Sequence, residues 1–470
     1  MSINEIINAV DGFVWGVPLM VLILGVGLLL TIRTGAQRFL GHGIKNLFSK
    51  ESSGAGEVSP FASLCTALSA TIGTGNIVGV ATAIGAGGPG ALFWMELAAV
   101  VGIATKFTEC MLAVKYREIA ADGHVMGGPF YYIEKGMGAG WKWLAKLFCV
   151  FGVLAGLLGI GTITQINGIT TAAQNFFDPE AAHVMFTLAQ GTDSETVITL
   201  TTIIAGLAVT ICAALVIIGG LKRISAVAEK VVPVMAVMYF AISILLIICN
   251  ITKLPNAIYL IVYGAFKPEA VAGGIAGISI KIAMQKGIAR GIFSNEAGLG
   301  SAPIAAAAAQ TDEPVRQGTI SMLGTFIDTI VICTMTGLAI IMTGAWEQGL
   351  KGAAVTSYAW QVGLPIPAKI SAFLLMVCLA FFAFTTILGW SYYSERCLEY
   401  LLGEKNSFVK SYRWLYIAAI FIGPYLTVSA VWNLADIFNG LMAFPNLVAL
   451  FALSGIAAKE VQAYREKLNK

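Results

Sequence analysis

Charged side chains are scarce in this sequence. Aspartate, glutamate, lysine and arginine together make up 12% of the 470 residues, and hydrophobic residues make up 57%. Soluble domains carry about 25% charged residues. A chain this long with half that charge is not typical of a soluble protein, and it indicates a protein that crosses the membrane several times.

Patterns for metal binding, disulfide bonding and catalysis are also missing. The eight cysteines form no C-x-x-C pair, the three histidines are dispersed, and no H-E-x-x-H motif or nucleophile elbow occurs. These absences argue against a disulfide framework and against a metal site of the usual spacing. No paired catalytic set emerges either, so we expect the protein not to be an enzyme.

Long hydrophobic runs are abundant instead. A membrane-spanning helix needs about 20 mostly apolar residues. Windows of that length predict an all-α polytopic membrane protein with eleven transmembrane helices, at 13–32, 62–86, 90–116, 143–172, 196–219, 225–250, 278–308, 317–344, 368–401, 412–431 and 434–457. Asp11, rather than a basic cluster, precedes the first run, so we expect this run to be a retained helix and not a cleaved signal peptide.

Lysine and arginine are distributed asymmetrically between the loops. If the N-terminus lies outside, eleven spans place the C-terminus inside, and most of the 29 basic residues then lie on the inner side. The outer loop 173–195 carries four acidic residues and no basic one. Because basic loops stay cytoplasmic, we predict a plasma-membrane protein with its N-terminus outside and its C-terminus in the cytoplasm. The net charge of +3 then reflects topology and predicts no nucleic-acid partner.

Two glycine-rich interruptions occur at corresponding positions, in "TIGTGNIVGV" (71–80) and "SNEAGLGSAPIAAAAA" (294–309). Aligning 73–76 with 298–301 places the next spans at matching distances. A dinucleotide-binding loop is excluded because the acid at the required distance, Glu96, lies inside the next apolar span. Close helix packing through small residues remains an alternative for either segment taken alone.

The repeat predicts how the chain is organised. Each half holds five spans, and an odd number forces the two halves to be inverted relative to each other. The predicted parts are an extra helix with a basic cytoplasmic loop (1–61), a first repeat (62–255), an outer amphipathic connection (256–277), a second repeat (278–457) and a cytoplasmic tail (458–470).

Broken helices at corresponding positions of an inverted repeat are typical of a secondary transporter's binding site. The free N–H groups at such a break can bind a carboxylate, and the free carbonyls can bind a small cation. The residues therefore favour transport of a small anionic or zwitterionic solute, coupled to a cation. A channel is the alternative from another class, but channels favour rings of identical filter elements.

Three motifs also resemble a known family. They are the second glycine segment together with "GGPGALFWMELAAVVG" (87–102) and "GGPFYYIEKGMG" (127–138). They resemble the alanine or glycine:cation symporter family, and the resemblance covers nearly the whole chain. It implies sodium-coupled symport of alanine or glycine into the cell by alternating access, with sodium as the coupling ion and not as a tightly held cofactor. Proton coupling, or another small zwitterionic or anionic solute, is the alternative. Where the family usually has a second tryptophan after F-W-M, this chain has Glu96.

The glycine motifs further resemble those of the leucine-transporter fold, in which the broken helices are the first and sixth of ten core helices. By that resemblance, the amides of Thr74 and Gly75 bind the substrate carboxylate. The other substrate-binding residues that it implies are Asn76, Gln165, Phe293, Ser294 and Trp390. For Gln165 the alternative is a bond to a neighbouring helix, and for Phe293 and Trp390 it is ordinary packing.

The same resemblance places a sodium ion between the first broken helix and core helix eight. The ligands that it implies are the carbonyls of Ser69, Ile72 and Phe382 and the hydroxyls of Thr385 and Thr386. Threonine hydroxyls also bond back to their own helix, which is the alternative. A second sodium site would use Asn76, Ser294 and Asp328.

Charged residues inside spans are costly and mark candidate functional sites. Asp328 lies midway along its span, where it can bind sodium or form a structural hydrogen bond or ion pair. Arg290 is expected to pair with Glu96 or Glu296 as an outer gate, and a static structural pair is the alternative. Lys106 and Glu109 are one helical turn apart, and we expect them to form a structural pair.

Overall fold

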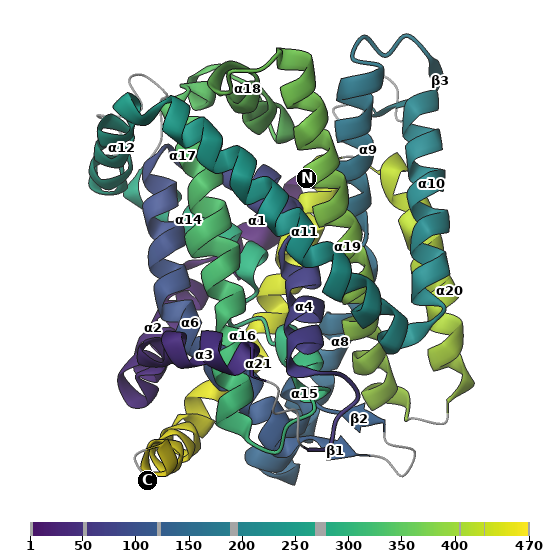
Figure 1. The fold of residues 1–470 in the computed structure, drawn as a ribbon. Helices are drawn as coiled ribbons and strands as arrows, with labels where there is room; N and C mark the ends of the chain where they lie inside the picture. Colours follow the sequence, from purple (N-terminus) through teal and green to yellow (C-terminus); the bar gives the residue numbers. More distant parts are fainter. Residues whose placement is uncertain are drawn as a thin grey trace.

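The computed structural model describes residues 3–49, 54–119, 124–188, 196–267, 279–403, 406–426 and 428–468. These residues form a tall bundle of helices whose long axes run mostly in one direction (Figure 1). Helices α12 (Leu254–Phe266) and α18 (Ala353–Gly363) lie at one end. The C-terminus and the short strands β1 (Glu118–Ile119) and β2 (Val125–Met126) lie at the other end. Under the predicted orientation, the end with α12 and α18 is the outer end, and we use "outer" and "inner" in that sense.

The helices follow the apolar runs closely. In the N-terminal half, the remaining ones are α1 (Ile3–Val14), α2 (Val17–Thr34), α3 (Leu40–Leu47), α4 (Pro60–Thr71), α5 (Val80–Gly87), α6 (Gly90–Tyr116), α7 (Pro129–Tyr131), α8 (Lys142–Leu158), α9 (Ile163–Phe177), α10 (Leu200–Ile217) and α11 (Gly220–Cys249). In the C-terminal half they are α14 (Ile280–Asn295), α15 (Ala302–Ala307), α16 (Pro314–Thr325), α17 (Thr334–Met342), α19 (Ala368–Leu402), α20 (Ser407–Ile422) and α21 (Val428–Leu468).

Eight helical segments of the described chain are long and apolar enough to cross a membrane, or nine when α4 and α5 count as one bent span. The predicted run 278–308 appears as two pieces, α14 and α15, and the run 412–431 appears as α20, which has 16 residues. The chain is therefore a mostly helical, multi-span protein. The count of eleven and the complete five-plus-five layout stay predictions.

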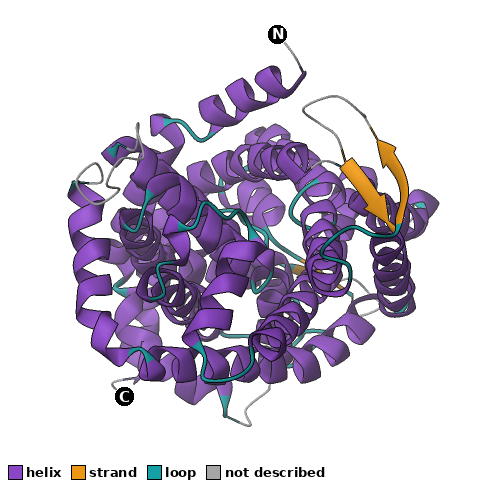
Figure 2. Ribbon diagram, turned by 90° about the horizontal axis from the view of Figure 1, so that it is seen from above, coloured by secondary structure: helices purple, strands orange, loops and turns teal. Residues whose placement is uncertain are grey.

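Three features differ from the expectation of simple spans. The run 143–172 is divided into α8 and α9, and the π-helical segment Phe326–Cys333 separates α16 from α17. A hairpin of β3 (Val184–Leu188) and β4 (Thr196–Thr199) projects beyond the helices on the outer side (Figure 2). This hairpin and the pair of β1 and β2 are the two small sheets in the described part of an otherwise helical chain.

The first broken helix begins with a strong cap. The Ser59 hydroxyl accepts a hydrogen bond from the Ala62 N–H, and Pro60 takes the first helical position, two features that stabilise a helix start. Helix α4 then ends at Thr71, because Ile72 has an extended backbone. Helical structure resumes in the π-helical segment Gly75–Gly79, and the two parts of the span are bent by 48°.

The two broken helices lie side by side in opposite directions. At the outer end, a Cβ on Gly87, the last residue of α5, would lie 2.9 Å from Cα of Ala283, near the start of α14. At the inner end, the Ser63 hydroxyl, near the start of α4, donates to the Ala305 carbonyl of α15. Each half-helix therefore packs against the opposite half of the other broken helix, as an inverted pair requires.

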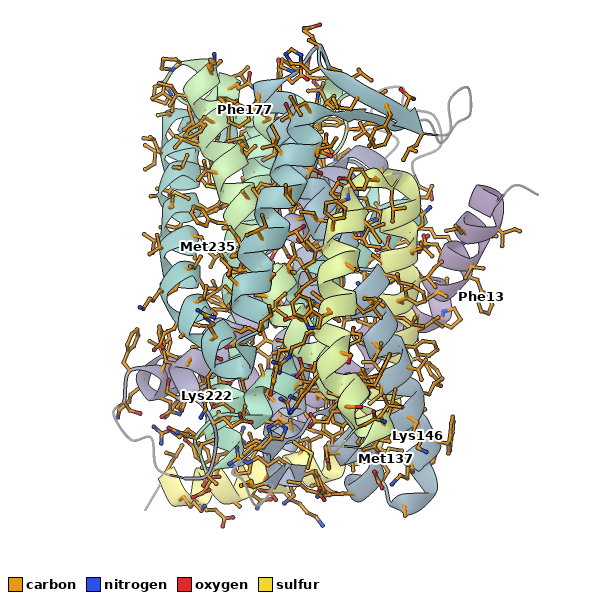
Figure 3. The ribbon with its side chains drawn as sticks, turned by 90° about the vertical axis from the view of Figure 1, so that its right-hand side faces the viewer. Phe13, Met137, Lys146, Phe177, Lys222 and Met235 are labelled. Atoms are coloured by element: carbon orange, nitrogen blue, oxygen red, sulfur yellow. The ribbon has the colours of Figure 1, made fainter. Side chains whose placement is uncertain are left out.

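Basic residues concentrate at one end of the bundle. Lys146 and Lys222 lie at the inner end, whereas Phe177 lies towards the outer end (Figure 3). This separation agrees with the loop assignment made from the sequence, and the direction in which the chain faces the membrane stays a prediction.

Candidate functional site

The second break is formed by residues with left-handed backbone. Glu296, Gly298 and Gly300 have φ of 56°, 93° and 81°. Such angles cost little for glycine but disfavour other residues, so the two glycines allow the turn and Glu296 is held in it by its surroundings. The backbone between α14 and α15 is thereby freed from helical hydrogen bonding in the middle of the bundle.

Asp328 joins the two breaks. Its Oδ1 accepts a hydrogen bond from Asn76 Nδ2 at 2.7 Å, and its Oδ2 accepts one from the Ser294 hydroxyl at 2.8 Å. Thr329 Oγ1 also donates to Oδ2 at 2.8 Å. All four side chains are fully buried. The structure therefore brings together the three residues predicted for the second sodium site, one from each broken helix and one from the π-helical segment after α16.

Gln165 binds the backbone amide of Thr74 at the first break. Its Oε1 accepts the Thr74 N–H at 3.0 Å, and its Nε2 donates to the Ile160 carbonyl at 2.9 Å. Thr74 was predicted to bind a carboxylate through that same amide, so the Gln165 oxygen stands where a carboxylate oxygen would bind. The Thr74 hydroxyl is buried and has no hydrogen-bond partner among the described residues.

Gly75 faces the second broken helix at very short range. A Cβ at this position would lie 3.1 Å from Cα of Ser294 and 3.2 Å from Cδ1 of Phe293. Phe293 in turn packs against Trp432, with ring centroids 5.0 Å apart. Aromatic rings therefore line the breaks on one side, and the contact of Phe293 with a substrate stays a prediction.

Three of the groups predicted to bind the other sodium ion lie together, and they belong to Ile72, Phe382 and Thr386. Thr386 Oγ1 is 3.2 Å from the Ile72 carbonyl of the first break and 3.0 Å from the Phe382 carbonyl of its own helix, α19. Thr385 Oγ1 points elsewhere, because it lies 3.5 Å from Met235 Sδ on α11 and donates to the Phe381 and Phe382 carbonyls. The Ser69 hydroxyl donates to the Thr66 carbonyl, which leaves the Ser69 carbonyl as its predicted ligand group.

This difference between the adjacent threonines gives a prediction. Thr386→Ala is expected to raise the sodium concentration required for half-maximal substrate binding by at least about tenfold, because it removes the hydroxyl that bridges Ile72 and Phe382. Thr385→Ala is expected to shift that concentration less than about threefold. The measurement is substrate binding to purified protein across a sodium titration. Equal shifts in the two variants would contradict the assignment of Thr386 as the bridging ligand.

The predicted pairing of Arg290 with Glu96 or Glu296 is wrong. Arg290 forms two parallel hydrogen bonds of 2.7 Å to both oxygens of Asp436, on α21. Its guanidinium also stacks over the rings of Trp432 and Phe293, at 4.9 and 5.6 Å. A planar guanidinium matches a carboxylate in this two-pronged geometry, so Asp436 is the natural partner once α21 packs beside α14.

The two acids that were expected to join that gate have other surroundings. Glu296 accepts hydrogen bonds from Trp390 Nε1 at 2.6 Å and from the Ser301 hydroxyl at 2.7 Å. Trp390 thus anchors the second break, and its predicted place over the substrate side chain stays a prediction. Glu96 forms no ion pair with a basic side chain among the described residues.

A further buried cluster supports the second break. Glu109 Oε1 accepts hydrogen bonds from the Gly298 N–H at 3.0 Å and from Asn446 Nδ2 at 2.5 Å, and Asn446 Nδ2 also donates to the Gly298 carbonyl. Lys106 is 2% exposed, and its ammonium group has no hydrogen-bond partner among the described residues. Glu109 therefore fixes the backbone of the break, and the predicted structural pair with Lys106 is wrong, because the Lys106 ammonium forms no ion pair or hydrogen bond with Glu109.

Comparison with known proteins identifies the protein family. The family described as the sodium:alanine symporter family matches residues 1–470. The chain belongs to the sodium:alanine symporter family. It is therefore a transporter and not an enzyme, and a multi-pass protein of the cell membrane.

Individual relatives agree with this membership over nearly their whole length. The sodium/alanine symporter AgcS of Methanococcus maripaludis is 42% identical, with 99% of this chain and 98% of AgcS aligned. An uncharacterized transporter of Haemophilus influenzae is 51% identical, with 100% and 97% aligned. The probable sodium/glutamine symporter GlnT of Bacillus subtilis is 36% identical, with 98% and 91% aligned.

A solved structure of a Na⁺-coupled sialic acid symporter, in a substrate-bound outward-open state, is also similar. It is 12% identical, the aligned parts cover 95% of this chain and 86% of that one, and the TM-score is 0.47.

For this member of the sodium:alanine symporter family, sequence reasoning overlooked several residues. Asp436 is a carboxylate within the last span, so the criterion that singled out Asp328 was sufficient to find it. Trp432 and Asn446 carry no comparable signal. Trp432 falls between two predicted spans, and an amide such as that of Asn446 within a span is compatible with ordinary packing. Arg117 carries no signal in the sequence beyond its place among the basic residues of the inner side.

Proposed function

We propose that the protein is a secondary active transporter that carries small neutral amino acids, alanine or glycine, into the cell together with sodium by alternating access. The observation that carries this proposal is the Asp328 network, which ties Asn76 of the first break to Ser294 of the second. A cation held at this junction would favour the arrangement in which both breaks present their free backbone groups to a substrate.

The substrate carboxylate would bind the amides of Thr74 and Gly75. To do so, it would displace the Gln165 oxygen from the Thr74 N–H, and the released Gln165 amide would then be free to contact the substrate. The buried Thr74 hydroxyl is available to the same carboxylate. This exchange supports an amino-acid substrate, because a carboxylate replaces the carboxamide oxygen at little cost in hydrogen bonds.

Sodium would be carried as a co-substrate at two places. Hard cations such as sodium prefer oxygen ligands, and both predicted sites supply them. One site would use Asn76, Ser294 and Asp328. The other would use the carbonyls of Ser69, Ile72 and Phe382 with the hydroxyl of Thr386. The Thr385 hydroxyl, which the sequence also predicts as a ligand, points towards Met235 instead. The contact between Thr386 and Ile72 supports the sodium site that contains Thr386, since this contact already links the first break to α19.

The route from outside would pass through a cavity of about 360 Å³ between α9, α18 and α19. Ala172 and Leu379, which line this cavity, lie seven residues outward of Gln165 and Thr386 on the same two helices. Seven residues are about two helical turns. Ala172 therefore lies on the same face of α9 as Gln165, and Leu379 lies on the same face of α19 as Thr386. The Arg290–Asp436 pair would act as an outer gate that closes when the substrate is enclosed.

This gate gives a second prediction. Removing Arg290 leaves a buried and unpaired Asp436, which commonly destabilises a protein by about 3–5 kcal/mol. Arg290→Met is therefore expected to lower the thermal stability of the purified protein markedly. Arg290→Met combined with Asp436→Leu is expected to restore most of the stability but not the uptake. Full uptake by the double variant would contradict a gating role for the ion pair.

The proposed function is tested by uptake of labelled alanine into vesicles that contain the purified protein. We expect saturable accumulation that requires an inward sodium gradient and fails when choline replaces sodium. A proton gradient applied without sodium separates the proton-coupled alternative. Unlabelled glycine is expected to compete well, and leucine and glutamine poorly, because Phe293 and Trp432 enclose the breaks. If leucine competes as well as glycine, the small-pocket assignment is wrong.

A further inference from the structure

The chain segments at the inner ends of the two broken helices are joined through their backbones. The segment that leads into α4 and the segment that follows α15 run in parallel, with a bridge between Val58 and Ala309. The Glu57 N–H donates to the Ala308 carbonyl at 2.8 Å, and the Gln310 N–H donates to the Val58 carbonyl at 2.8 Å. The two half-helices that face the inner side are thus tied together where they reach the surface.

Gly56 permits this close contact. A Cβ at Gly56 would lie 2.5 Å from the carbonyl carbon and oxygen of Ala309 and 2.5 Å from the Gln310 nitrogen. Real Cβ atoms do not approach backbone atoms so closely, so any larger residue would have to separate the two segments. The contact therefore depends on a glycine at this position.

Arg117 lies across the joined segments. Its Nη1 donates to the carbonyls of Ala307 and Ala309, each at 2.7 Å. Its Nη2 donates to the carbonyls of Ala55 and Thr311, each at 2.6 Å. One guanidinium thus binds one carbonyl before the first broken helix and three at or after the end of the second. Arg117 itself follows α6, which is a separate and unbroken helix.

We propose that Arg117 is a positioning residue that latches the inner ends of the two broken helices together and thereby keeps the inner side of the transport path closed. The proposal deepens the proposed function and rests on its alternating access. A path to the inner side requires α4 and α15 to separate, since these half-helices pack on each other between the breaks and the inner surface. Four hydrogen bonds from one side chain, divided between the two segments, must break before they can part.

Lysine cannot replace this arginine at the latch. A guanidinium presents five N–H donors in a fixed planar fork, whereas an ammonium presents three donors at one point. The four carbonyl acceptors come from both segments, and the fork contacts them simultaneously. Arg117→Lys thus keeps the positive charge and removes the geometry, so an electrostatic role alone predicts no change in this variant.

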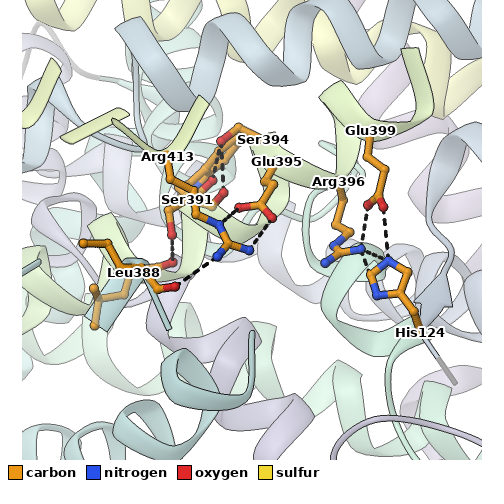
Figure 4. A network of polar contacts seen from close by, with 10 residues as sticks. His124, Leu388, Ser391, Ser394, Glu395, Arg396, Glu399 and Arg413 are labelled. Carbon is orange, nitrogen blue, oxygen red and sulfur yellow. Dashed lines mark hydrogen bonds and ion pairs between the residues drawn. The ribbon is translucent and has the colours of Figure 1, made fainter. Parts of the chain in front are cut away.

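A second layer of polar contacts covers the same place. Glu57 Oε1 accepts the Val125 N–H at 2.8 Å, which attaches β2 to the segment before α4. On α19, Arg396 and Glu399 pair with each other and contact His124, and Glu395 pairs with Arg413 of α20 (Figure 4). Because Glu57 also lies beside His124, these contacts connect the segment before α4 to α19.

The test uses Cys65 as a reporter of opening. Cys65 is a buried thiol on α4, next to Thr66, whose hydroxyl lies 2.9 Å from that of Ser225 on α11. It becomes accessible from the inner side only if α4 moves away from the bundle. Inside-out vesicles in sodium buffer without any amino acid are treated with a membrane-impermeant maleimide, and labelling of Cys65 is followed by peptide mass spectrometry.

We expect Arg117→Lys to raise the labelling rate of Cys65 at least tenfold over the wild type. Gly56→Ala attacks the same contact from the other side without changing a charge, and we expect it to do the same. The matched control is Arg465→Lys. Arg465 is also an inner arginine that donates to a backbone carbonyl, that of Thr34, but it touches neither broken helix.

The proposal is overturned if neither Arg117→Lys nor Gly56→Ala raises the labelling rate more than twofold, or if Arg465→Lys raises it equally. If Arg117→Lys is not recovered as folded protein, the result for Gly56→Ala decides. The readout needs no substrate, so failure of alanine uptake by the wild type would refute the proposed function while leaving the latch result intact.

Discussion

Asp328→Asn is expected to abolish sodium-driven accumulation of alanine in a protein that still folds and reaches the membrane. The carboxylate accepts hydrogen bonds from Asn76, Ser294 and Thr329, so it is the group that joins the two broken helices. Asparagine has nearly the same shape, but it carries no charge and presents an NH₂ group to one set of donors. Losing charged hydrogen bonds commonly costs about 1.5–3 kcal/mol each.

We therefore expect the sodium midpoint for alanine binding to rise by about 100-fold, which corresponds to about 2.7 kcal/mol. The measurement is alanine binding to purified protein across a sodium titration. The matched control is Asp178→Asn, because Asp178 is a buried aspartate of the outer loop 173–195 that accepts the Ala182 N–H away from the site. A sodium midpoint within threefold of wild type in Asp328→Asn would remove Asp328 from the sodium site.

Gly75→Val is expected to eliminate alanine binding, lowering the affinity by at least about 100-fold. The first Cβ would already lie 3.1 Å from Cα of Ser294 and 3.2 Å from the Phe293 ring, and valine adds two further methyl groups. Overpacking of a close contact forces backbone shifts, and here a shift would move the amides that are proposed to bind the carboxylate.

The control for this variant is Gly85→Val. Gly85 lies on α5, the half-helix that follows the same break, and a Cβ there would meet nothing within 4 Å. Both variants place valine in the same span, so they differ mainly in the space around the site. Wild-type alanine affinity in Gly75→Val, measured on folded protein, would contradict the proposal that the Thr74 and Gly75 amides bind the substrate carboxylate.

Much of the fold was predictable because its signals are local. The apolar runs follow from chain composition, and both breaks follow from glycines that the sequence shows directly. The antiparallel placement of the broken helices follows from counting spans. Thr386 was one of two adjacent candidates, since neighbouring residues on a helix point about 100° apart and one of them was expected to face the first break.

The side-chain partners were less predictable. Arg290 and Asp436 are 146 residues apart in the chain, and their pairing depends on how α21 packs against α14. The division between α8 and α9 was also missed. A Cβ on Gly161 would lie 2.6 Å from that of Trp390, so this break lets the indole approach closely, and only the packed structure shows that need.

The proposed transport requires sodium and alanine to bind together at the two breaks. The most direct test is to measure the alanine affinity of the purified protein at several sodium concentrations, and the sodium midpoint at several alanine concentrations. Coupling of two ligands is reciprocal for equilibrium binding. We therefore expect sodium to tighten alanine binding, and alanine to tighten sodium binding, by the same factor of at least about tenfold. Alanine binding of equal affinity when choline replaces sodium would contradict the account.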